Sequence, residues 1–321
     1  MFQCASVGEK TRSAKEAIEF GGMMNTIKKS RISFVILAAI CAVLLCFGMS
    51  ACTLGDYTPA KKEAQLKTPD ILENGKLKVG VDFGNPPMAG ETSKPSGIDV
   101  DVASAIADDL GLDVEFVDVG TSPDLALSNK KVDIVMGVSS TMKAEEIWKS
   151  DAYIKTAPAL FAKDSSLPIP VKGGADKFST EMGSVSAIAC QEQFDAANIK
   201  LENNLSASFE ALDRGDVKYV AADAIIGTYG ARQDQVDASI VALLTQPGGY
   251  CIGAAKDKEK LIEKIKGSLE NLDKGGILSV IERSWMGKNL ELDKAKFTAE
   301  GASKPAANDA DGVYGSDTKE E

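Results

Sequence analysis

The sequence predicts an α/β protein made of two similar lobes with mostly parallel sheets. Strand and helix patterns alternate along residues 76–138, and an alternating pattern returns in residues 185–223. An Ala-Leu pair followed by two valines occurs within residues 126–135, and the same residues recur at the same spacing within residues 211–220. Two lobes of one topology are the simplest explanation of this repeat.

The composition excludes several classes of function. The chain has 321 residues, of which 26% are charged and 44% apolar, and these values suit two packed domains rather than a disordered or collagen-like chain. It contains no histidine, which excludes Ser-His-Asp and Cys-His catalysis and zinc sites with histidine ligands. The net charge of -11 argues against a nucleic-acid partner, because phosphate binding needs clustered Lys and Arg.

Residues 1–51 have the pattern of a lipoprotein signal peptide. Basic residues at positions 28, 29 and 31 precede an uncharged apolar run that ends in Met-Ser-Ala-Cys at 49–52, a sequence that resembles the bacterial lipobox. We predict that Cys52 is lipidated (diacylglyceryl and palmitate) and anchors the exported chain to the outer face of the cytoplasmic membrane. An uncleaved transmembrane helix is the alternative, and translation starting at Met23 or Met24 is a second open question. The polar residues 52–69 are predicted to be a flexible tether.

The first lobe is predicted over residues 70–160 together with 250–292. Apolar alternation predicts a strand at 77–82, and Asp99 is a suitable N-cap for an amphipathic helix that ends at Gly111. A strand at 114–119 follows, then a helix at 124–130 and a buried strand at 132–138. This β-α-β order predicts parallel pairing with right-handed crossovers.

The second lobe is predicted over residues 161–249. Residues 185–190 are predicted to form a strand, 208–214 a helix, and 219–222 a strand that ends at Asp223. Two further helices are predicted after the second lobe, where the chain has returned to the first lobe. They cover residues 261–272 and 277–285 and are separated by Gly275-Gly276. Residues 293–321 have few large apolar side chains and are predicted to be a disordered tail.

The order of these segments resembles the bacterial extracellular solute-binding proteins of family 3, receptors that deliver polar amino acids to ABC importers. The resemblance covers residues 66–287, essentially the whole predicted folded part, and each motif alone is weak while their order and spacing together are strong. The residues that carry it are Lys76 to Asp82 with Pro86-Pro87, Gly97 to Ala103, Lys131 to Val135, Val220 to Asp223, Tyr250 to Gly253, and Leu272 to Gly276 with Trp285 to Gly287.

The resemblance implies a type II periplasmic-binding-protein fold and a role in transport. In that fold two crossing strands, here 157–163 and 249–255, join the lobes, and a ligand in the interlobe cleft stabilises closure. It implies a monomer that binds a small polar solute and meets ABC permease subunits, with the membrane contacted through the lipid anchor only. It implies no catalytic residue, no cofactor and no metal.

The expected binding site departs from the family pattern. The arginine that grips the ligand carboxylate in relatives is replaced by Ala144, with Lys143 beside it as a point charge or an exposed helix lysine. The Gly-Thr-Thr type turn of the second lobe is replaced by Cys190-Gln191-Glu192-Gln193, so Gln191 and Glu192 are candidate site residues. The aromatic positions hold Asn85 and Gly120, Met88 stands where Phe is common, and Phe83 is a candidate substitute.

Other site positions match the family. Asp223 corresponds to the carboxylate that binds the ligand ammonium in relatives, although it is an equally good N-cap for a helix starting at Ala224. Gly137, Val138 and Ser139 can form hydrogen bonds with a ligand, and Asp82 is expected to order the cleft loop. The ammonium half of an amino-acid site is therefore expected to survive and the carboxylate half to be lost, which predicts an amine-bearing solute.

Cys190 and Cys251 follow the export signal, and outside the cytoplasm such a pair tends to oxidise. A disulfide between them and two buried free thiols are both open interpretations.

Two alternatives to a transport receptor also remain. One is an enzyme similar to the cyclohexadienyl dehydratases, which share this fold. The other is a surface lipoprotein that has lost ligand binding.

Overall fold

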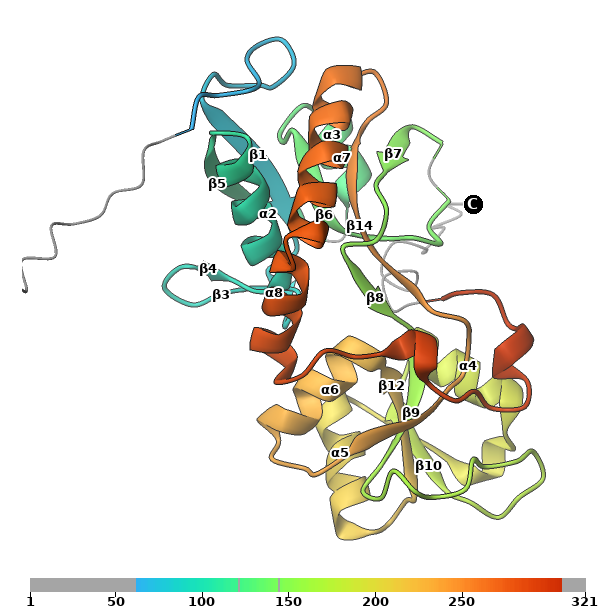
Figure 1. The fold of residues 1–321 in the computed structure, drawn as a ribbon. Helices are drawn as coiled ribbons and strands as arrows, with labels where there is room; N and C mark the ends of the chain where they lie inside the picture. The colour runs from blue at the N-terminus through green and yellow to red at the C-terminus, as the bar shows by residue number, and fades with distance from the viewer. Residues whose placement is uncertain (1–61, 121, 144, 308–321) are drawn as a thin grey trace, which may run out of the picture. The chain divides into compact units, whose positions relative to one another are not determined.

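The computed structural model describes residues 62–120, 122–143 and 145–307, and it shows two α/β lobes (Figure 1). The predicted signal peptide, Cys52, Ala144 and the last part of the predicted tail lie outside the described residues. Within the described part of the chain, no helix is long and apolar enough to cross a membrane.

Lobe 1 is built around a sheet with the strand order β5-β1-β6-β14-β7, in which β8 also pairs with β14. β1 lies parallel to both β5 and β6, whereas β14 runs antiparallel to β6. The strands are β1 (Lys76–Val81), β5 (Asp113–Asp118), β6 (Ile134–Ser139), β7 (Ile147–Lys149), β8 (Ile154–Thr156) and β14 (Gly248–Ala255). The helices are α2 (Ile98–Asp109), α3 (Pro123–Ser128), α7 (Glu259–Lys274) and α8 (Ile277–Met286). A small sheet of β2 (Gly84–Asn85), β3 (Ala89–Glu91) and β4 (Pro95–Ser96) follows β1.

Lobe 2 repeats this plan with the strand order β11-β10-β12-β9-β13. β10 is parallel to β11 and β12, and the returning strand β9 is antiparallel to β12 and β13. The elements are β9 (Pro158–Ala162), β10 (Phe178–Glu181), α4 (Val185–Gln193), β11 (Ile199–Glu202), α5 (Leu205–Arg214), β12 (Tyr219–Asp223), α6 (Ala224–Gln233) and β13 (Ser239–Leu243), with a short 3-10 turn η2 at Ala196–Asn198. The predicted α/β class and parallel β-α-β units are confirmed.

The chain passes between the two sheets where β8 leads into β9 and where β13 leads into β14. β8 and β14 pair side by side, with Gly248 opposite Thr156, so the two connections are adjacent. This is the arrangement of crossing strands that the resemblance implied.

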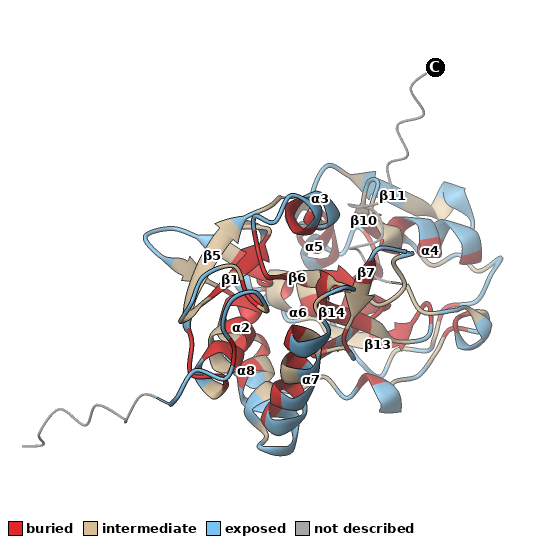
Figure 2. Cartoon of the chain, turned by 90° about the horizontal axis from the view of Figure 1, so that it is seen from above, coloured by how far each residue is buried: buried red, intermediate tan, exposed pale blue. Residues whose placement is uncertain are grey.

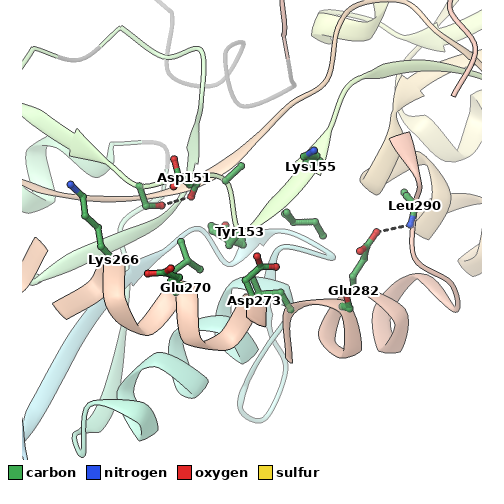
Figure 3. Close-up of a pocket in the computed structure, with 14 residues that line it drawn as sticks. Asp151, Tyr153, Lys155, Lys266, Glu270, Asp273, Glu282 and Leu290 are labelled. Atoms are coloured by element: carbon green, nitrogen blue, oxygen red, sulfur yellow. Dashed lines mark hydrogen bonds between the residues drawn. The ribbon is translucent and has the colours of Figure 1, made fainter. Parts of the chain in front are cut away.

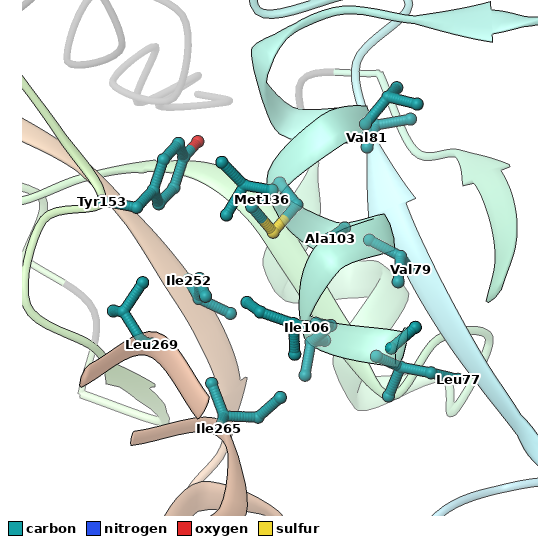
Figure 4. Close-up of a cluster of buried hydrophobic side chains, with 14 of the residues drawn as sticks. Leu77, Val79, Val81, Ala103, Ile106, Met136, Tyr153, Ile252, Ile265 and Leu269 are labelled. Atoms are coloured by element: carbon teal, nitrogen blue, oxygen red, sulfur yellow. The ribbon is translucent and has the colours of Figure 1, made fainter. Parts of the chain in front are cut away.

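Each lobe has its own hydrophobic core. In lobe 1, side chains from β1, α2, β6, β14 and α7 interlock, among them Leu77, Ile106, Met136, Ile252 and Ile265 (Figure 4). In lobe 2, two clusters cover the two faces of the sheet. Buried residues follow the central strands, while the outer faces of α4 and α7 are exposed (Figure 2). Each lobe therefore has a core of its own, although Ile225 of α6 in lobe 2 is buried in the lobe 1 cluster.

The predicted strand at residues 185–190 is wrong, because these residues form the first part of helix α4. The Ser184 side chain accepts a hydrogen bond from the Ala187 amide at 3.0 Å, which caps a helix. The buried positions of α4 are Ser186, Ala187, Ala189, Cys190 and Gln193, and this spacing is helical. The strand in this region is β10, which ends at Glu181 before the helix begins.

Both ends of the described chain are more ordered than predicted. Leu66, assigned to the tether, is buried in the lobe 1 core. The predicted tail includes the short 3-10 turns η3 (Leu292–Lys294) and η4 (Gly301–Ser303), and Phe297 bridges to Leu243 at the edge of lobe 2. Thr298 is buried and donates a hydrogen bond of 2.5 Å to Gln193. Ala295 and Phe297 also pack against the lobe 2 core, so a few apolar contacts together with polar and backbone hydrogen bonds order this segment.

Candidate functional site

A cavity of about 390 Å³ is lined by residues of both lobes. Lobe 1 contributes the loop Gly84-Asn85-Pro86, and lobe 2 contributes the ends of β10 and β12 with the starts of α4 and α6. The lobe 2 residues that line it are Glu181, Met182, Gly183, Ser184, Val185, Leu205, Ala221, Ala222, Asp223 and Ile226. A ligand here would touch both lobes.

The topology of lobe 2 explains why the cavity lies here. β10 and β12 are parallel neighbours, so their carboxyl ends meet at one edge of the sheet. Each strand is followed at once by a helix, so the N-termini of α4 and α6 lie at the same edge. Backbone N–H groups at a helix start lack partners within the helix and carry partial positive charge. The residue that caps each helix therefore decides the charge that the cavity presents.

Asp223 caps α6 with a charged side chain. Its Oδ1 accepts hydrogen bonds from the Ile225 and Ile226 amides at 2.9 and 3.0 Å, and its Oδ2 accepts one from the Thr156 hydroxyl at 2.5 Å. Burial raises the pKa of Asp223 to about 6, while these donors favour the ionised form. The helix-cap interpretation of Asp223 is thus seen directly, and the same residue also lines the cavity.

Ser184 caps α4 with a neutral side chain. Besides accepting from Ala187, its hydroxyl donates a hydrogen bond of 2.9 Å to the Glu181 carbonyl, which closes the turn between β10 and α4. Gly183 in this turn has a φ of 84°, a conformation that favours glycine. Because Ser184 brings no charge, the positive end of α4 faces the cavity without a carboxylate cap.

Glu181 lines the cavity and was not among the residues predicted from the sequence. It is half-buried at the end of β10, and burial raises the pKa of its carboxyl. The misplaced strand at 185–190 moved the expected turn to residues 190–193 and hid this position. A serine N-cap after a glycine was the signal that could have placed the strand end correctly.

Of the predicted binding residues, Asn85 and Asp223 line the cavity and the others do not. Asp82 accepts a hydrogen bond of 2.9 Å from the Gly84 amide and orders the loop. Phe83 packs against the lobe 1 core, in which Met88 is fully buried.

The backbone at the end of β6 is engaged within lobe 1. The Gly137 amide donates a hydrogen bond of 2.9 Å to the Tyr153 hydroxyl, and Ser139 is bonded to Thr141 at 2.8 Å. Val138 is buried in a core cluster beneath β6. These groups hold the end of β6 in place.

The remaining predicted residues are on the surface. Lys143 is exposed, as are Gln191 and Glu192 on the last turn of α4. Glu192 forms an ion pair of 2.6 Å with Lys304, away from the cavity lining. Residues 190–193 therefore do not line the cavity, and the turn that does is Gly183-Ser184, before α4.

Cys190 and Cys251 are both buried and not bonded to each other. Cys190 lies on α4 of lobe 2 and Cys251 on β14 of lobe 1. Burial raises the pKa of Cys190 to about 12 and that of Cys251 to about 11, so both are inert thiols at neutral pH. Of the two interpretations of these cysteines, the structure shows the buried free thiols.

A larger cavity of about 690 Å³ lies beside α7 and α8 (Figure 3). It is lined by the segment Ser150–Lys155 and by α7, α8 and Leu290, without any lobe 2 sheet or helix residue. Glu282 in this wall accepts a hydrogen bond of 2.6 Å from the Leu290 amide. Because closure of the lobes buries only what lies between them, the smaller interlobe cavity is the candidate functional site.

Comparison with known proteins places this geometry in context. The L-cystine-binding protein TcyA of Bacillus subtilis (strain 168) is 24% identical over 285 residues, which cover 82% of this chain and 99% of the relative. A polar amino acid ABC uptake transporter substrate-binding protein from Streptococcus thermophilus superposes with a TM-score of 0.60 at 22% identity, covering 72% of this chain and 92% of that one. The L-cystine solute receptor of Neisseria gonorrhoeae, in an unliganded open conformation, gives a TM-score of 0.58 at 21% identity and covers 67% of this chain and 94% of that one.

These structural likenesses show the type II periplasmic-binding-protein fold. The model of the bacterial extracellular solute-binding proteins, family 3, matches residues 77–288, which span both lobes from β1 to the end of α8. Relatives in this family are solute-binding proteins rather than enzymes, so the dehydratase alternative is set aside. The chain therefore belongs to the bacterial extracellular solute-binding proteins of family 3 and is an exported solute-binding protein.

Proposed function

We propose that the chain is the receptor of an ABC importer and binds an amino acid or a related amine-bearing solute in the interlobe cavity. The observation that carries this proposal is the pair of differently capped helices at one cavity edge. Asp223 presents negative charge at the start of α6, whereas neutral Ser184 leaves the positive end of α4 available. A zwitterion has one group for each end.

The group proposed to bind the ligand ammonium is the Asp223 carboxylate, which can accept one more hydrogen bond. Asp223 accepts three hydrogen bonds, and an ionised carboxylate offers about four acceptor sites. A ligand ammonium is therefore a fitting fourth donor, and it would offset the cost of holding this charge buried.

The carboxylate side is the turn before α4. The backbone amides and the Ser184 hydroxyl of this turn are the donor types that stabilise an anion at a helix start. The expectation that the carboxylate half of the site is lost rested on the absent arginine, with Ala144 at its position, and on the turn expected at 190–193. The donors before α4 offer another place for a carboxylate, so ordinary α-amino acids are included among the candidate ligands. The B. subtilis relative is named as an L-cystine-binding protein, which supports this class of ligand.

Isothermal titration calorimetry of the full chain in detergent tests the proposal, with L-amino acids that include L-cystine and with amines that lack a carboxylate. We expect saturable binding of at least one amino acid and a loss of about tenfold or more in Asp223→Asn, because a charge-assisted hydrogen bond is removed. Asp234→Asn, which alters a carboxylate bonded to Ser206 outside the cavity, is the matched control. Unchanged affinity in Asp223→Asn would show the ammonium assignment to be wrong, and no binding by any compound would favour a lipoprotein without a ligand.

Anchoring through Cys52 is the second part of the proposal, and it rests on the sequence pattern at 49–52. We expect labelled palmitate to be incorporated into the chain and Cys52→Ser to prevent both incorporation and membrane retention. Membrane retention of Cys52→Ser with the apolar run intact would support an uncleaved transmembrane helix instead.

A further inference from the structure

The cavity contains a carboxylate that has no partner in the described part of the chain. Glu181 is half-buried at the end of β10, and its side chain forms no hydrogen bond or ion pair with any described residue. Its neighbour in register on β11 is Glu202, which forms an ion pair of 2.6 Å with Lys200. Glu202 is therefore paired with a cation, whereas Glu181, on the adjacent strand, lines the cavity without one.

The rest of the cavity wall supplies no compensating charge. Among the described residues that line it, Glu181 and Asp223 are the charged side chains and both are acidic. Asp223 already accepts three hydrogen bonds, whereas Glu181 accepts none on its carboxylate. A single ligand ammonium at Asp223 would leave Glu181 to be closed into the cleft as an unpaired charge, which is strongly unfavourable.

The register places the two carboxylates on separate but neighbouring strands. The pairing of Thr180 with Ala221 puts Glu181 beside Ala222, one residue before Asp223. Adjacent strands lie about 4.8 Å apart, so the carboxylates are close enough to contact two groups of one small ligand.

Resting on the function proposed above, we infer that the ligand carries a second cationic group and that Glu181 binds it. The substrate class is then an α-amino acid with a cationic side chain. Its carboxylate lies at the start of α4, its ammonium at Asp223 and its side-chain cation at Glu181. Glu181 is therefore a specificity-determining residue, whereas Ser184 and Asp223 bind the part common to all amino acids.

Titration calorimetry with two matched ligand pairs tests this inference. L-Arginine is compared with L-citrulline, and L-lysine with L-norleucine, because each pair keeps a similar shape and differs in side-chain charge. We expect the full chain to prefer the cationic member by about tenfold or more. Glu181→Gln should remove this preference by weakening the cationic member, with the neutral member changed by less than about threefold.

Glu202→Gln is the matched control, since it changes the register neighbour of Glu181 and leaves the cavity lining intact. Melting curves without ligand confirm that each variant is folded. Equal affinity for the cationic and neutral members, or an unchanged preference in Glu181→Gln, would overturn the inference and leave the proposed function standing. Failure of every amino acid to bind would overturn both.

Discussion

Each lobe holds one buried aspartate at the start of a helix, and the short segment from Tyr153 to Thr156 supplies a hydroxyl to both. In lobe 1, Asp99 in the first turn of α2 accepts a hydrogen bond from Tyr153, immediately before β8. In lobe 2, Asp223 before α6 accepts one from Thr156 at the end of β8. The segment that connects the lobes thus contacts a carboxylate in each of them.

The two aspartates differ in the number of donors around them. Asp223 has the Thr156 hydroxyl and two backbone amides, whereas Asp99 has Tyr153 alone among the described side-chain partners. Burial raises the pKa of Asp99 to about 7, with nearby Asp82 adding to the rise, and that of Asp223 to about 6. The three donors at Asp223, against one at Asp99, favour the ionised form of Asp223 and make it the better partner for a ligand cation.

We expect the strongest change in the pH dependence of the free energy of unfolding, to which buried Asp99 contributes. Because its pKa is raised in the folded state, the folded chain keeps a proton that the unfolded chain releases above about pH 4. This contribution to stability is complete below that pH and is lost as the pH rises through about 7, by on the order of 4 kcal/mol. Urea unfolding between pH 4 and pH 8 should show a larger loss in the native chain than in Asp99→Asn, which keeps only the part due to other buried carboxyls such as Asp223. Parallel curves for the two would contradict it.

Removing the hydroxyl in lobe 1 should be the next largest effect. Tyr153→Phe takes the donor from Asp99 and also the acceptor from the Gly137 amide. Two buried polar groups then lack a partner, so the free energy of unfolding should fall by about 2–4 kcal/mol. Urea unfolding at pH 7.5 measures the change. The double variant Tyr153→Phe with Asp99→Asn should recover part of the lost free energy of unfolding, because a neutral amide is easier to bury than a charge. No recovery would show that the effect of Tyr153 does not act through Asp99.

Removing the hydroxyl in lobe 2 should have a smaller effect. Thr156→Val leaves Asp223 with the Ile225 and Ile226 amides, so we expect a loss of about 1–2 kcal/mol. The same urea titration compares it directly with Tyr153→Phe. A larger loss in Thr156→Val than in Tyr153→Phe would break the argument from donor number.

The same contrast between local and long-range information explains what the sequence could predict. Alternation in β1 and the helical spacing of α2 are local, and both elements were found with the correct parallel pairing. The run from Val185 to Cys190 is apolar apart from Ser186 and is compatible with a strand, but the Ser184 cap and the helical spacing of its buried residues show a helix. The local pattern predicts that Asp223 ends a strand before a helix, as the structure shows, whereas its role toward a ligand ammonium comes from the family resemblance and stays a prediction. Glu181 could not be predicted as a cavity residue, because this depends on where β10 ends and on a cavity lined by residues of both lobes.

The smallest expected effect separates the two ends of α4. Glu192 is exposed at the C-terminal end and paired with Lys304, whereas the cavity lies at the N-terminal end beside Glu181. Exposed ion pairs contribute about 0–1 kcal/mol, so Glu192→Gln should change the free energy of unfolding by less than about 0.5 kcal/mol. It should leave ligand affinity unchanged, in contrast to Glu181→Gln. Calorimetry of the two variants side by side measures their ligand affinities. Loss of affinity in Glu192→Gln would show that the C-terminal end of α4 is part of the site, and it would remove the reason to place the ligand carboxylate at Gly183-Ser184.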